Sequence, residues 1–96
     1  MLVKLTEVCG TGAVTTGRRY SLREVFVNPE HVVMVREEHQ MKSLNEQGML
    51  TEGLSKDHRF SKITIDKGTT GTDIVVIGDP NAVETALNNR SYVLRG

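Results

Sequence analysis

The sequence predicts a mainly β domain, a small, strongly bent, five-stranded antiparallel open barrel followed by a C-terminal helix. Three observations predict it. The core must rest on Val, Ile, Leu and Met because only four of the 96 residues are aromatic, and richness in Val and Ile favours sheet. Five short apolar segments are separated by turn residues. One clear helix start lies near the C-terminus. The length suits a single domain over residues 1–96, with the barrel over about residues 1–78.

The first two strands are expected on either side of a polar loop. Residues 1–8 mix apolar and polar positions in the manner of a short strand. Residues 9–17 are rich in Gly and Thr and favour a loop. A second strand over 20–27 ends at Asn28-Pro29, because proline removes a ladder donor and asparagine favours a turn.

A third strand is predicted over residues 31–37, so that the second and third strands resemble one strand bent or folded back at residues 28–30. Residues 39–58 show no clean period, and Gly48 and Gly53 interrupt any helix. We therefore expect a long variable loop there, with at most a helical turn near 41–47.

The C-terminal third contains a hairpin and a helix. Alternation over 60–66 and the apolar run 73–77 predict two strands joined by a Gly-rich loop. Asp79 then caps a helix whose first residue is Pro80. The helix is expected over about residues 80–89, with a short extended tail after it.

Charge and cysteine content exclude several classes of protein. The chain carries 12 basic and 12 acidic residues, with an acidic middle between mildly basic ends, so clustering decides whether a polyanion can bind. One cysteine, Cys9, allows no internal disulfide and points to a reducing compartment. No window approaches a membrane span, and no signal peptide is evident. We expect a cytoplasmic protein, in the host cell if phage-encoded, with no membrane partner.

Enzymatic motifs are weak. Residues 12–19 have the spacing of a phosphate loop but lack its Lys-Ser/Thr ending and lead into a strand. His31, His39 and His58 have no spacing typical of metal ligands, and His58 beside Asp57 has no positioned partner. No catalytic residue, metal or cofactor is predicted.

Basic and aromatic residues are neighbours at three places, Arg18-Arg19-Tyr20, Arg59-Phe60 and Arg90-Ser91-Tyr92. This combination can hold phosphate and stack a base, although Phe60 is expected to face the core.

The order of elements resembles the Sm/LSm fold, a bent five-stranded open barrel that assembles into rings and binds RNA. Residues 27–32 stand where that family has an Asn-containing turn, and residues 63–68 resemble its apolar segment ending in Arg-Gly, with Lys67 in place of Arg. The family's Met-Asn pair is absent, and the helix follows the barrel here instead of preceding it. The chain is also similar to small Sm-like proteins of cyanophage origin from marine metagenomes.

The resemblance implies a nucleic-acid site at Asn28 and His31 in one loop and at Lys67 and Gly68 in another. It also implies a homo-oligomeric ring of about five to seven subunits, in which one Lys per subunit becomes a circle of positive charge. We expect the ring to form by pairing of the strand near 60–66 with the strand near 73–77 of a neighbour.

Two further functions compete with a ring-forming, non-enzymatic protein that binds RNA or DNA. The neutral charge favours a structural or adaptor subunit of a phage or cellular assembly. A small hydrolase or nuclease is the third hypothesis, and only His58 and scattered carboxylates support it.

Overall fold

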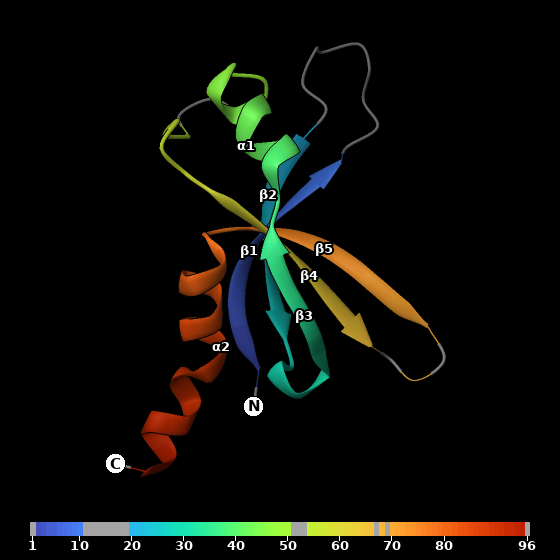
Figure 1. The fold of residues 1–96 in the computed structure, drawn as a ribbon, viewed down its shortest axis with the longest axis vertical. Helices are drawn as coiled ribbons and strands as arrows, with labels where there is room; N and C mark the ends of the chain where they lie inside the picture. The colour runs from blue at the N-terminus through green and yellow to red at the C-terminus, as the bar shows by residue number, and fades with distance from the viewer. Residues whose placement is uncertain (1, 11–19, 51–53, 67, 69, 96) are drawn as a thin grey trace.

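The computed structural model describes residues 2–10, 20–50, 54–66, 68 and 70–95, of which residues 89–95 are described by backbone alone. Five strands and two α-helices follow one another along the chain (Figure 1). Their bounds, with one short 3₁₀ helix η1 among them, are β1 Val3–Gly10, β2 Tyr20–Val27, η1 Pro29–His31, β3 Val32–Glu37, α1 His39–Glu46, β4 Phe60–Asp66, β5 Gly71–Ile77 and α2 Pro80–Arg95.

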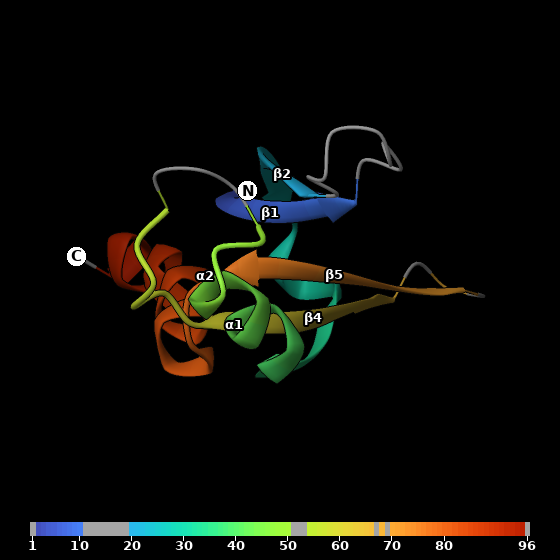
Figure 2. The ribbon, with the colours of Figure 1, turned by 90° about the horizontal axis from the view of Figure 1, so that it is seen from above.

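The five strands form one sheet in the order β2-β1-β5-β4-β3, and every neighbouring pair is antiparallel. The mainly β class is therefore confirmed. β1 joins β5 through only two residue pairs, Glu7 with Val76 and Val8 with Val75. The sheet bends sharply there, so that β1 and β2 lie over β5 and β4 (Figure 2). Within the described residues no ladder joins β2 to β3, and the sheet is open.

Both faces of the bent sheet carry a hydrophobic core, because alternate strand residues point to opposite faces. One core gathers Val27, Ile63 and Val76 beneath Val83 and Leu87 of α2. The other gathers Val8, Phe60 and Leu50, with side chains of α1 packed against them. A helix-bearing segment thus covers each face.

The predicted hairpin is confirmed, since β4 and β5 pair along their whole length from Phe60 with Ile77 to Asp66 with Gly71. The expected pairing of these strands with a neighbouring copy is wrong. β4 lies between β5 and β3, and β5 lies between β4 and β1. The edge strands of the described sheet are β2 and β3.

The turn between β2 and β3 is the short helix η1, with Pro29 near its start. Asn28 caps it by accepting a hydrogen bond from the Glu30 N–H at Oδ1, 3.0 Å away. Of the two predicted alternatives at residues 28–30, a bend or a fold-back, the fold-back is wrong. No ladder joins β2 to β3 among the described residues, and the two strands lie at opposite edges of the sheet.

A helix, α1, occupies the first part of the expected loop. Gly48, interpreted from the sequence as an interruption, instead ends this helix in a Schellman motif. Its φ of +74° is the left-handed conformation that glycine adopts readily. The Gly48 N–H donates to the Asn45 carbonyl at 3.0 Å, and the Met49 N–H donates to the Leu44 carbonyl at 2.9 Å.

The helix start at Asp79 is confirmed, since the Ala82 N–H donates to Asp79 Oδ1 at 2.9 Å. The predicted end is wrong, because α2 continues through Asn88 and the expected tail to Arg95. The Asn88 amide donates to the Glu84 carbonyl one turn back, at 3.1 Å, and so joins the helix rather than ending it.

Arg59 ties this helix start to the sheet. It donates to both carboxylate oxygens of Glu37, at 2.7 and 2.8 Å, and to Asp79 Oδ2 at 3.3 Å. The Arg59 hydrogen bonds hold the pKa of Glu37 below its ordinary value.

Asp79→Ala is expected to lower the free energy of unfolding by about 0.5–2 kcal/mol, because it removes the cap of α2. Thermal melting measures the loss. Asp79→Asn is the control: asparagine caps as well as aspartate, and the exposed contact with Arg59 contributes little. If Asp79→Asn melts as low as Asp79→Ala, the cap is not the source of the stability.

Candidate functional site

A groove of about 340 Å³ opens where the two arms of the bent sheet diverge. Its walls come from the open end of the β1–β2 hairpin, the turn after β2 and the end of the β4–β5 hairpin that lies next to its turn. The lining residues are Leu2, Val25, Phe26, Val27, Asn28, His31, Ile65, Thr72 and Ile74. The groove is therefore apolar along its walls, with Asn28, His31 and Thr72 as its polar groups.

The structure brings two of the predicted site residues together, because Asn28 and His31 both line this groove. The oxygen and the nitrogen of the Asn28 carboxamide differ in their hydrogen bonding. Its oxygen accepts the Glu30 N–H, while its Nδ2 makes no hydrogen bond with the described residues. Asn28 can thus offer an N–H₂ donor to a ligand without giving up the turn that it caps.

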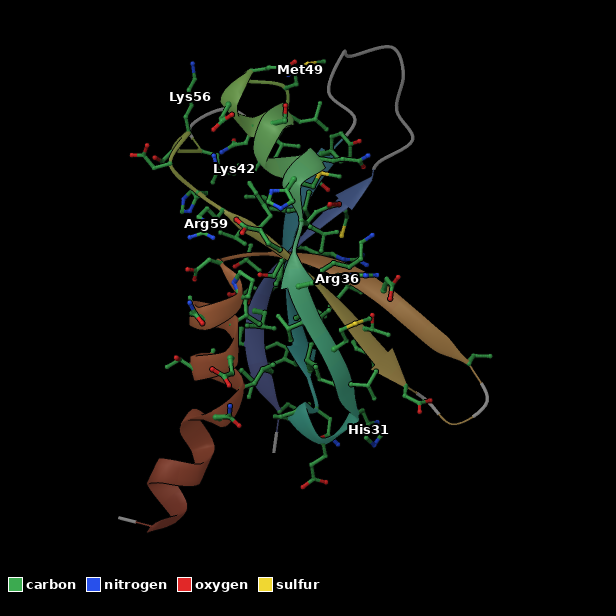
Figure 3. The ribbon with its side chains drawn as sticks, viewed as in Figure 1. His31, Arg36, Lys42, Met49, Lys56 and Arg59 are labelled. Atoms are coloured by element: carbon green, nitrogen blue, oxygen red, sulfur yellow. The ribbon has the colours of Figure 1, made fainter. Side chains whose placement is uncertain are left out.

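His31 is exposed at the end of η1, directly before β3 (Figure 3). Gly68 belongs to the β4–β5 turn, where its φ of +98° suits glycine and its N–H donates to Asp66 Oδ1 at 2.9 Å. Gly68 is not among the groove residues. Lys67, the predicted phosphate contact, lies outside the described residues.

Sequence reasoning missed Phe26, whose side chain is 57 % exposed at the groove. The signal was present, because Phe26 lies between Val25 and Val27, which face the core, and strand alternation turns it outward. Lys4 lies directly opposite it on β1 and pairs with Glu24 at 3.4 Å. An exposed aromatic ring and a cation therefore adjoin each other here.

The neighbouring basic and aromatic residues noted in the sequence do not form this site. Phe60 is fully buried, and Arg59 is engaged with Glu37 and Asp79. Tyr20 packs against the second core, while Arg18 and Arg19 lie outside the described residues. Arg90 and Tyr92 are described by their backbone alone.

The groove can hold a flat, largely apolar group and give it one or two hydrogen bonds. Phe26 borders the groove with an exposed aromatic side chain, and Asn28 offers a hydrogen-bond donor. Among the described residues, no three His, Cys, Asp or Glu side chains gather closely enough to hold a metal ion. The described helices include none long and apolar enough to cross a membrane.

Comparison of the chain with protein-family models, curated proteins and solved structures finds no match.

Proposed function

We propose that this protein is a non-enzymatic, Sm-like binding protein that takes single-stranded RNA or DNA in the groove beside Asn28. The observation that carries the proposal is that Phe26, Asn28 and His31 line the same groove. Exposed aromatic rings stack bases of any sequence, and amide groups read base edges.

The resemblance to Sm proteins gives the proposal a second element, an open barrel that assembles into a ring. The free edges of β2 and β3 support it, because ring closure would cover two edges that otherwise invite uncontrolled pairing. Light scattering tests the assembly. A mass at a closed multiple of the chain is expected, and a monomer at high concentration would remove the ring while leaving nucleic-acid binding open.

An adaptor subunit is the second candidate, and a second groove favours it. This groove, about 450 Å³, lies between β3 and α2. Val33 and Met34 line it and are 61 % and 42 % exposed on an edge strand. Apolar residues beside a free strand edge suit an extended protein segment. Such a partner would bind without any dependence on oligonucleotide.

Asn28 provides the test of base recognition. Asn28→Ala should change the preference between poly-U and poly-A more than it changes the salt dependence, because an amide reads a base edge and does not neutralise phosphate. Fluorescence titrations of both polymers at two salt concentrations measure these effects.

Asn28→Ser is the matched control for the turn. Serine keeps an oxygen that can accept the Glu30 N–H and removes the N–H₂ donor. The same change of preference in Asn28→Ser assigns it to that donor. If Asn28→Ser keeps the wild-type preference between poly-U and poly-A, Asn28 only stabilises the turn that it caps and does not recognise a base.

A further inference from the structure

Two basic side chains oppose each other directly across the ladder between β3 and β4. Arg36 is the register partner of Lys62, and Arg36 is exposed while Lys62 is half-buried. Directly opposed residues on neighbouring antiparallel strands have Cβ atoms about 4.5–5.5 Å apart, and like charges in that position destabilise the sheet. The register therefore predicts that the pair lowers the free energy of unfolding of the ligand-free protein.

The other Lys and Arg side chains on the described strands have carboxylate partners. Lys4 pairs with Glu24, and Arg23 pairs with Glu7. Neither Arg36 nor Lys62 has an ion pair with a described residue.

Two carboxylates lie one step along the ladder on that face. Glu38 follows Arg36 by two residues and forms no ion pair with Arg36 or Lys62. Asp73 on β5 lies opposite Thr64 and accepts the Thr64 hydroxyl at 2.8 Å. Asp73 is thus engaged one step along the ladder. An anion from solution could therefore supply the partner that the charges of Arg36 and Lys62 lack among the described residues.

The pair lies on the face of β3 and β4 opposite to the core under α2. Val35 and Ile63, the next residues along each strand, belong to that core, so alternation turns Arg36 and Lys62 the other way. Figure 3 shows the Arg36 side chain directed away from α2.

We propose that Arg36 and Lys62 together hold a phosphate group of the nucleic-acid backbone. The planar guanidinium can donate two parallel hydrogen bonds to phosphate oxygens, and the ammonium adds a compact positive charge. This inference depends on the proposed function for the identity of the ligand. The requirement for an anion depends only on the opposed charges.

Arg36→Gln and Lys62→Gln test the proposal against Lys56→Gln, which removes the same charge from an exposed position outside the helices and strands. With single-stranded oligonucleotide, each variant of the pair should lower the slope of log affinity against log salt by roughly 0.7, because one cation no longer neutralises a phosphate. Each should also raise Tm by roughly 1–8 °C at low salt, because it ends the repulsion. Lys56→Gln should change neither quantity. An unchanged slope, or a lower Tm, in both variants of the pair would overturn the proposal.

Inorganic tripolyphosphate separates this site from the proposed function. It should raise the Tm of the wild-type protein and leave that of the double variant Arg36→Gln/Lys62→Gln unchanged, even if no oligonucleotide binds. An equal rise in both proteins would overturn the anion site. If oligonucleotide binds and Phe26→Ala weakens it while the double variant does not, the groove keeps its function and the Arg36–Lys62 site is excluded.

Discussion

Phe60→Ala is expected to lower the free energy of unfolding by about 3–5 kcal/mol, the usual loss for a buried Phe truncated to Ala. Phe60 is fully buried and packs with Val8 and Leu50 in the core on the α1 side of the sheet. A domain of this size has about 5–15 kcal/mol in total. Thermal melting should therefore show a fall in Tm of at least about 12 °C.

Phe60→Leu is the matched control, because leucine fills much of the same volume and leaves a smaller cavity. Its loss should be clearly smaller than that of Phe60→Ala. A shift of only a few degrees for Phe60→Ala would mean that this core does not hold the α1 segment to the sheet.

Phe26→Ala is expected to weaken binding of single-stranded oligonucleotides by about 5- to 150-fold, since stacking on one aromatic ring contributes about 1–3 kcal/mol per base. The loss should be similar for different sequences, because every base has a ring face. Anisotropy titration with labelled oligonucleotides measures it. The Tm should change little, because the side chain is 57 % exposed.

Two control variants accompany Phe26→Ala. Phe26→Trp should retain affinity, because tryptophan offers a larger ring face. Met49→Ala removes an apolar side chain that is 51 % exposed and outside the groove, and it should bind as the wild-type protein does. Equal losses in Phe26→Ala and Met49→Ala would point to general apolar contact instead of stacking.

Local patterns predict the hairpin of β4 and β5 because alternation and a Gly-rich turn are adjacent in the sequence. The start of α2 is predictable for the same reason, since Asp79 and Pro80 act on their own helix. Its end is not, because Asn88 bonds back to Glu84. The sequence alone does not reveal α1, because Gly48 can either interrupt a helix or end one. The helix is stabilised by tertiary contacts, since Met41 and Leu44 pack against the core on that face of the sheet.

The site is only partly predictable because it depends on strand order, which is set by contacts between distant segments. Asn28 and His31 are close in sequence, so one local segment is enough to predict both as site residues. Their position beside Ile65 and Thr72 follows from the sheet bending between β1 and β5. The same strand order places β4 and β5 in the interior, which a succession of apolar segments does not reveal.

Binding of the wild-type protein to a labelled single-stranded oligonucleotide, measured across a series of salt concentrations, tests the central claim most directly. Phosphate contacts release counterions, so the logarithm of the affinity should fall linearly with log salt. Measurable binding at low salt that weakens along this line is the expected result. Absence of binding to any oligonucleotide at low salt would contradict nucleic-acid binding and favour the adaptor.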